Sequence, residues 1–391
     1  MSELAAFLVD EVIPHVPIRQ VVLTFPIPVR FWISKNPALQ SQLLSISIRA
    51  YSRLLRKKAK AQGITGKLRY AVVSVIQRMG GSINLNPHYH SLWVDGLYDV
   101  SQKEPVFVQL PPPTDEEIKE LVETISKRII RCLKRKGYRV DEFSNDEQED
   151  DEIFTEVQSA SVQSLIALGE RRGKKVRRLG VVERGYLDGA IIEGPRCASH
   201  NGFSLHADVS CGAEEREKLE HMARYIARPP VAMDRLHLRP DGLITYRLKN
   251  RYRDGTEMLL FSPMELMEKL AASVPRPRIH STRYHGLFAP HSKARSKIVL
   301  GAQKEKKEKT PADSPSDIAK KETRISWAKL LNRVFRIDVT HCRFCRGEIK
   351  VVAAIMERTA IEKILSHLGL PTEPPAILPA RSPPQQEFDA F

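Results

Sequence analysis

The chain has 391 residues, 42% of them hydrophobic and 28% charged, and 62 Lys and Arg against 47 Asp and Glu give it a net charge of +15. These fractions are typical of a globular protein and exclude a wholly disordered chain, and no apolar run or signal-peptide pattern indicates a membrane. The positive charge favours a polyanionic partner, and five cysteines, an odd number, favour a reducing, cytoplasmic location.

The first hundred residues alternate predicted strands with one helix. β-branched runs bounded by Pro or Gly predict strands at 17–26, 69–78 and 87–95. Residues 37–62 carry Leu and Ile at helical spacing and stop at Gly63, so they predict a helix. The Gly/Ser/Asn-rich stretch 79–86 predicts a hairpin between the second and third strands.

A long helix is predicted at 114–136, where Thr114 and Glu117 form a capping box and the apolar period runs to Gly137. An acidic segment (141–152) and a basic run (171–178) follow. Charge blocks of this kind favour a solvated insertion, near residues 140–180, over a functional site.

Strand character returns at 203–209, and a helix is predicted from about 214 to 228 because Pro229 and Pro230 must end it. Polar residues without periodicity at 301–323 predict a flexible charged linker. We therefore expect a core at 1–300 and a small C-terminal domain with a Pro-rich tail at 324–391.

Two histidines, His88 and His90, lie on the same face of a predicted strand because strand side chains alternate. Two imidazoles at this spacing can chelate one divalent cation, and the amide oxygen of Gln77 on the preceding strand would add a third ligand. Such a site leaves coordination positions of the metal ion open for a substrate. A structural or surface role for both histidines is the alternative.

The helix near residue 225 offers a nucleophile. Its apolar face is built by Leu219, Met222, Ala223 and Ile226. Tyr225 lies at the edge of that face, between Arg224 and Arg228. It is either a boundary residue or a phenol that attacks a phosphodiester, with a metal ion and guanidinium groups stabilising the charge that develops. No phosphate-binding loop is present, because GITGK at 63–67 has the wrong spacing, so we expect no nucleotide cofactor.

Several long motifs appear in order: LVDEVIPHVPIRQVVLTFP (8–26), VIQRMGGSINLNPHYHSLWVDGLY (75–98), GFSLHADV (202–209), YIARPPVAMDRL (225–236) and PRPRIHSTRYHGLFAP (275–290). With them the chain, from about residue 5 to 355, resembles the rolling-circle transposases of insertion sequences and common-region elements. These belong to the HUH (His-hydrophobic-His) tyrosine nuclease superfamily.

The resemblance implies an α+β fold, an antiparallel sheet with packed helices around an HUH nuclease core. It implies that His88, His90 and Gln77 hold Mg²⁺ or Mn²⁺, and that Tyr225 becomes joined to the 5′ end of nicked single-stranded DNA. His206 is a further metal candidate, with a hydrogen-bonded sheet histidine as the alternative. His221 stands where two-tyrosine relatives carry their first tyrosine, which indicates a single-tyrosine enzyme.

Relatives begin with a cysteine-rich zinc-binding domain, and this chain starts where that domain should end, so we expect a truncated copy. A truncated, catalytically inactive DNA-binding remnant is therefore the main alternative to an active transposase. A metal hydrolase acting on small molecules is a third reading, which the positive charge disfavours.

Basic and aromatic residues alternate in 275–296, a pattern typical of single-stranded DNA binding, although a solvated basic loop is the alternative. Tyr284 and Phe288 would stack on bases. The predicted DNA-binding residues are Arg224, Arg228, Arg276, Arg278, Arg283 and Tyr284.

Cys342 and Cys345, with His341 adjacent, make half of a zinc site. A complete site would need long-range assembly with other cysteines, so a remnant or a small turn is the simpler interpretation.

Overall fold

The computed structural model describes a compact unit up to residue 311 and a second, C-terminal unit from residue 312. Within them it describes residues 2–138, 152–180, 194–228, 231–252, 254–275, 279–301, 325–342, 344–349, 355 and 357–372. The predicted linker and tail lie almost wholly outside these ranges, as do Arg276, Arg278, Pro229, Pro230 and most of the acidic segment.

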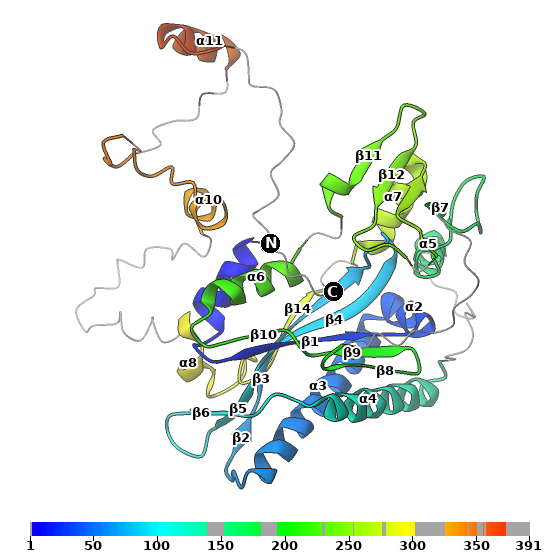
Figure 1. Ribbon diagram of the computed structural model, residues 1–391, viewed down its shortest axis with the longest axis vertical. Helices are drawn as coiled ribbons and strands as arrows, with labels where there is room; N and C mark the ends of the chain where they lie inside the picture. Colours follow the sequence, from blue (N-terminus) through cyan, green and yellow to red (C-terminus); the bar gives the residue numbers. More distant parts are fainter. Residues whose placement is uncertain are drawn as a thin grey trace. The chain divides into compact units, whose positions relative to one another are not determined.

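A seven-stranded antiparallel sheet organises the first unit, in the order β14-β3-β4-β1-β9-β8 with β10 also pairing β1 (Figure 1). Its strands are β1 (Ile18–Thr24), β3 (Ala71–Met79), β4 (Leu85–Val94), β8 (Cys197–His200), β9 (Phe203–His206), β10 (Ser210–Cys211) and β14 (Thr282–Gly286). The predicted α+β class with an antiparallel sheet is confirmed. All four predicted strands lie in this sheet.

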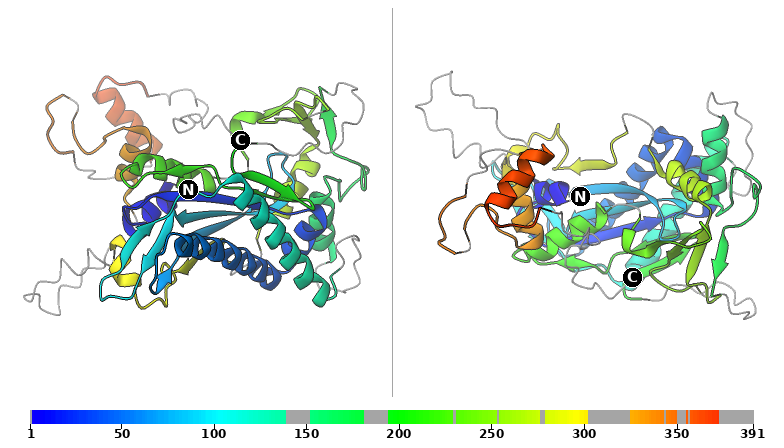
Figure 2. Two further views of the ribbon diagram at one scale, coloured as in Figure 1. Left: turned by 60° about the horizontal axis from the view of Figure 1, so that its bottom comes forward. Right: turned by 90° about the horizontal axis from the view of Figure 1, so that it is seen from above.

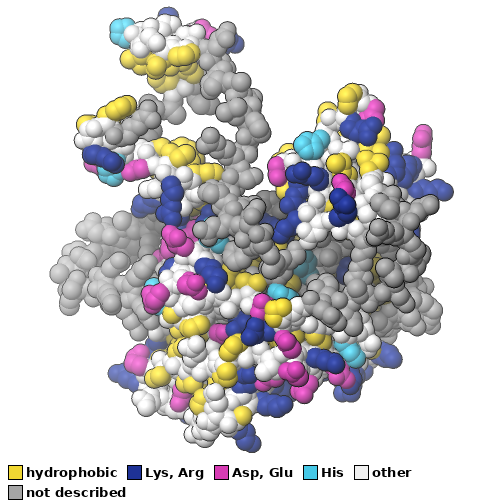
Figure 3. All heavy atoms as spheres, in the orientation of Figure 1, with side chains coloured by type: hydrophobic (Ala, Val, Ile, Leu, Met, Phe, Trp, Pro, Cys, Tyr) yellow, Lys and Arg dark blue, Asp and Glu magenta, His cyan; other side chains and the backbone are white. Residues whose placement is uncertain are grey.

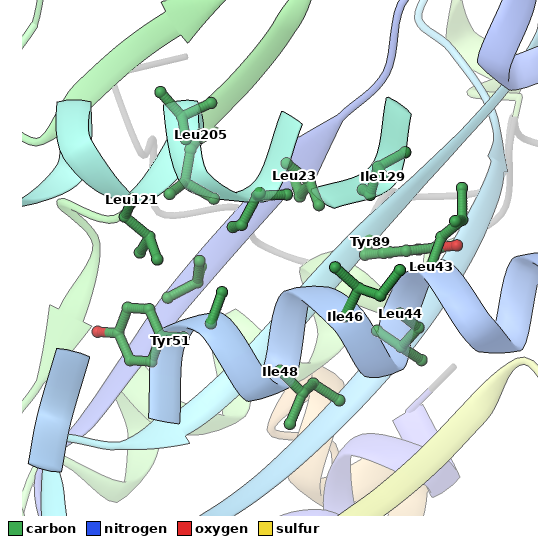
Figure 4. Packing of buried hydrophobic residues seen from close by; sticks show 14 of the residues in the cluster. Leu23, Leu43, Leu44, Ile46, Ile48, Tyr51, Tyr89, Leu121, Ile129 and Leu205 are labelled. Carbon is green, nitrogen blue, oxygen red and sulfur yellow. The ribbon is translucent and has the colours of Figure 1, made fainter. Parts of the chain in front are cut away.

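Two long helices cover one face of the sheet, α3 (Pro37–Ala61) and α4 (Asp115–Arg135). The predicted capping box of Thr114 and Glu117 is present at the start of α4. Apolar side chains of both helices meet the alternate strand residues that face them (Figure 4). The Tyr89 hydroxyl group donates to the carbonyl oxygen of Gln40 across 2.7 Å, so this buried ring is also satisfied as a polar group.

The opposite face of the sheet carries α6 (Arg216–Ile226), which lies beside α1 (Ser2–Phe7) and the π-helical turn η1 (Leu8–Val12) (Figure 2). Arg216 fixes this arrangement, because its guanidinium donates to the carbonyl oxygens of Val9, Ile13 and Pro14. Those carbonyls lie at the end of the N-terminal helical turns or just after it, so the arginine acts as their cap. The helix that carries Tyr225 is thereby tied to the N-terminus.

A four-stranded sheet adjoins the core in the order β11-β12-β13-β7. Its strands are β11 (Leu236–Leu238), β12 (Ile244–Arg247), β13 (Met258–Phe261) and β7 (Arg177–Leu179). The helices α5 (Glu152–Val162) and α7 (Pro263–Ser273) contact each other beside it.

The basic run 171–178 also contributes to the fold. Arg177 and Arg178 belong to β7, and both Arg171 and Arg177 form ion pairs with the buried Glu265 carboxylate. The cations neutralise a carboxylate that would otherwise be costly to bury, and charge spacing alone does not reveal such a partner.

The remaining elements of the first unit are short. They are α2 (Ile27–Lys35), β2 (Leu68–Arg69), β5 (Gly96–Asp99), β6 (Val106–Gln109), η2 (Met233–Arg235) and α8 (Arg295–Ile298). β2, β5 and β6 form a three-stranded sheet.

The C-terminal unit contains α10 (Trp327–Phe335), a tight turn around Cys342 and Cys345, and α11 (Arg358–His367). No helix among the described residues of either unit is long and apolar enough to cross a membrane.

Candidate active site

Strand pairing places His88 and His90 on the sheet face that α6 covers. In the β3–β4 hairpin Gln77 pairs with His88 and Val75 with His90, and residues directly opposite one another share a face. The two imidazole ring centroids are 4.9 Å apart. The predicted hairpin thus brings the three proposed ligands to one face.

Hydrogen bonds at the inner ring nitrogens orient both imidazoles. His88 Nδ1 lies 2.7 Å from the carbonyl oxygen of Asn86, which can only accept, so Nδ1 carries the proton and Nε2 keeps its lone pair. Nδ1 of His90 lies 3.3 Å from the side-chain amide of Gln20 on β1. The Gln20 side-chain nitrogen can only donate, so in this arrangement Nδ1 accepts and the proton lies on Nε2. Metal binding through Nε2 requires the other amide orientation, in which the Gln20 oxygen accepts from Nδ1–H.

Burial keeps both histidines neutral. Desolvation lowers the pKa of His88 and lowers the pKa of His90 well below the ordinary value for imidazole, and the positive charge of Arg228 lowers both further. Arg30 of α2 also lowers the pKa of His88. Neutral imidazoles bind divalent ions, whereas protonated ones do not.

Tyr225 faces the two histidines from α6, the helix that covers this side of the sheet. Its ring centroid lies 6.1 Å from that of His90, in an edge-to-face arrangement. The Arg228 guanidinium lies 4.1 Å above the Tyr225 ring, and its Nη2 donates to the phenol oxygen across 3.3 Å. The fully buried face of α6, which is that predicted from the sequence, fixes the rotation of the helix; it consists of Leu219, Met222, Ala223 and Ile226.

Gln77 has a role that its sequence position did not indicate. Its side-chain nitrogen donates to the carbonyl oxygen of Ile226 across 2.7 Å and lies 3.5 Å from that of Tyr225. These carbonyls lie in the last turn of α6, where a helix supplies few donors, and that of Tyr225 also accepts from Arg228 N across 3.4 Å. The amide nitrogen therefore caps the C-terminal end of α6, and the amide oxygen is the atom that could bind a metal ion.

The donor set suits a divalent cation. Two neutral imidazoles and one amide oxygen are ligands that Mn²⁺ accepts, and they leave coordination positions for a phosphate. Among the described residues, no further His, Cys, Asp or Glu completes a three-residue metal group. Gln77 as third ligand stays a prediction.

The other histidine candidates lie farther from this pair. His206 shares the face of His90, but the two are separated by Val22 on β1, which pairs with both. His221 lies one turn before Tyr225 on α6 and is half-buried. Neither position contradicts the sequence interpretation. To share a metal ion with His90, the His206 side chain would have to extend past Val22 on the strand between them.

The predicted DNA-binding residues separate into different environments. Arg224 pairs with Glu220 at 3.6 Å and is only 13% exposed, so Glu220 already neutralises its charge. Tyr284 shares the face of Val73 and of the metal candidates, whereas Arg283 lies opposite Ser74 on the face that the long helices cover.

Phe288 is completely buried, so the expectation that it stacks on a base is wrong. The alternation of basic and aromatic residues in the sequence does not reveal whether an aromatic side chain is buried in the core or exposed to solvent. Arg276 and Arg278 lie outside the described residues.

Two residues near the site were not recognised in the sequence. Gln20 lies within a β-branched strand and Arg30 within a helix that the Pro-rich segment 26–28 concealed. A polar residue in the middle of an otherwise apolar, buried strand is unusual. This signal could have identified Gln20, which is 3% exposed.

One comparison with known proteins identifies a family for this chain. No curated protein and no solved structure matches the chain. A family model described as "Putative transposase" matches residues 71–296, which contain His88, His90 and Tyr225. Because the match covers more than half of the chain, this protein belongs to that transposase family and its partner is DNA.

Proposed function

We propose that the protein is a metal-dependent transposase of the HUH, rolling-circle type, which nicks single-stranded DNA through Tyr225. The observation that carries the proposal is the 6.1 Å separation of the His90 and Tyr225 ring centroids. Two imidazoles suited to a metal ion and a phenol on one surface, beside the guanidinium of Arg228, fit a phosphodiester.

In this mechanism Tyr225 Oη attacks the scissile phosphorus. The Oη–P bond forms as the P–O3′ bond breaks, the 3′ oxygen takes a proton, and the phenol proton passes to solvent. Arg228 is placed to stabilise the charge that develops on the phenol oxygen. A Mg²⁺ or Mn²⁺ ion held by His88, His90 and Gln77 would polarise the phosphate.

Strand transfer is the same reaction in reverse. The phosphotyrosine ester conserves the energy of the broken bond, so a new 3′ hydroxyl group can displace Tyr225 without ATP. This agrees with the lack of a phosphate-binding loop motif in the sequence.

The test uses the full chain, Mn²⁺ and 3′-labelled single-stranded oligonucleotides that cover the DNA flanking the gene. We expect a labelled covalent adduct with the wild type and none with Tyr225→Phe. The matched control is Tyr252→Phe, since Arg178 lies 5.2 Å over that ring in the same way. An adduct that survives in Tyr225→Phe overturns the proposal, and salt-sensitive DNA binding without any adduct supports the inactive remnant.

A further inference from the structure

A short turn in the C-terminal unit is built around two thiols. The backbone N–H groups of Phe344 and Cys345 donate to the sulfur of Cys342, and the Cys345 thiol is within hydrogen-bonding distance of it. The flanking segments pair as a small hairpin, in which Cys342 N donates to the Gly347 carbonyl oxygen across 2.8 Å and Ile349 N to that of Thr340 across 2.7 Å. The sulfurs of Cys342 and Cys345 therefore lie close to each other.

The backbone after the second cysteine is shaped to leave room for sulfur. Arg346 has a φ of 61°, a left-handed conformation that is unfavourable for a side-chain-bearing residue. A Cβ atom on Gly347 would lie 3.4 Å from the Cys345 sulfur and would fill the space beside it. Backbone donors aimed at a sulfur stabilise the thiolate, which is the form that binds a metal ion.

Two thiolates do not complete a zinc site, which needs four ligands. The other cysteines belong to the first unit, where Cys132 and Cys211 are buried. His341 pairs with Glu348 across the hairpin and points away from its neighbour Cys342, toward Asp338 at 2.9 Å. No group of three such ligands occurs among the residues that the structure describes.

The same unit exposes apolar side chains that its own elements do not cover, and yellow side chains gather on its helices (Figure 3). They include Trp327, Ile337, Phe344, Ile349, Leu368 and Leu370. Phe344, between the two cysteines, is 84% exposed. Apolar exposure of this kind marks an interaction surface, and Phe344 places part of it directly at the incomplete metal site.

We propose that Cys342 and Cys345 bind Zn²⁺ together with the same two residues of a second copy of this chain. One ion would thus be held by four sulfurs and would join two transposase molecules. Four thiols release four protons to solvent as four Zn–S bonds form, with no change of oxidation state. A second copy completes the ligand set and can also cover the exposed Phe344 side chain beside it.

The experiment measures zinc content and molar mass of the full chain, purified in a metal-free reductant. We expect half an equivalent of zinc per chain and a dimer by light scattering, which becomes a monomer in a strong chelator. Cys342→Ser should lose both zinc and the dimer. Cys197→Ser, which removes a half-buried cysteine of the first unit, should keep both.

A titration of the apoprotein with Co²⁺ provides a second measurement that needs no variant. It should saturate at half an equivalent, with the thiolate charge-transfer absorption of a four-sulfur tetrahedral site. Saturation at one equivalent, an absence of bound zinc, or a dimer that persists without metal overturns the proposal. All of these readouts are independent of DNA cleavage, so failure of the proposed nuclease function does not affect them.

Discussion

The side-chain nitrogen of Gln77 donates to the carbonyl oxygen of Ile226 across 2.7 Å, and so ties the last turn of the tyrosine helix to the strand opposite His88. One amide thus reaches the helix with its nitrogen and can face a metal ion with its oxygen. The metal candidates and the nucleophile are thus directly connected, because Gln77, one of those candidates, holds the end of the helix that carries Tyr225.

Gln77→Glu separates these two roles. A carboxylate keeps an oxygen ligand but cannot donate to Ile226, so we expect Mn²⁺ affinity to be retained while single-turnover cleavage falls about tenfold. Metal affinity is followed by Mn²⁺ paramagnetic resonance and cleavage by adduct formation. Exchange of backbone amides at 222–228 should also accelerate. Cleavage at the wild-type rate would show that the hydrogen bond to Ile226 does not position Tyr225.

Gln20 should control the metal affinity of His90 without touching the ion. Gln20→Leu removes the hydrogen bond that orients the imidazole, and loss of such a partner typically costs about 10- to 100-fold in affinity. Calorimetric titration with Mn²⁺ measures the change. Thr24→Val is the matched control, since Thr24 shares the strand and face of Gln20 but bonds to Ser204. Equal affinities for Gln20→Leu and the wild type would exclude this role.

Arg228 should act on the reaction more than on folding. Arg228→Ala removes the guanidinium that bonds to the Tyr225 hydroxyl, so we expect adduct formation to slow about tenfold or more with unchanged thermal stability. Lys218→Ala, on the same helix and 41% exposed, should cleave as the wild type does. If both variants slow equally, a general loss of positive charge explains the effect better than a contact at the phenol.

Acid should destabilise the sheet through His285. Burial lowers the pKa of this β14 histidine to about 4, while the unfolded chain titrates near its ordinary value of about 6.5. The unfolded state therefore takes up the proton first, and the unfolding free energy falls as the pH drops from 6.5 to 4. Urea unfolding at several pH values should give a shallower dependence for His285→Gln than for the control His237→Gln. A dependence identical to that of the control would contradict this assignment.

Four strands of the central sheet and its two covering helices could be predicted from the sequence because their apolar patterns are strong. Strand alternation at His88 and His90, together with a hairpin turn, also sufficed to place Gln77 on their face. In each case the information is local, or depends on pairing between adjacent strands.

The features that were missed depend on contacts between distant segments. The second bond of Gln77 is to a helix far along the chain, and the burial of Phe288 and the pairing of Arg171 with Glu265 follow from tertiary packing. Local sequence patterns of charged and aromatic residues are the same whether the side chains are buried or exposed. The approach of Tyr225 to His90 was expected only from resemblance to a family.

The most direct measurement of the central claim is to map the covalently attached nucleotide by mass spectrometry. Trypsin should release residues 225–235 as one peptide, because the Arg228–Pro229 bond resists cleavage and Arg235 follows, and Tyr225 is the sole tyrosine in it. After reaction with single-stranded DNA and Mn²⁺, followed by nuclease digestion, we predict a 5′-phosphonucleotide mass on this peptide, located at Tyr225. Attachment to any other residue, or cleaved DNA with no modified peptide, would contradict the account.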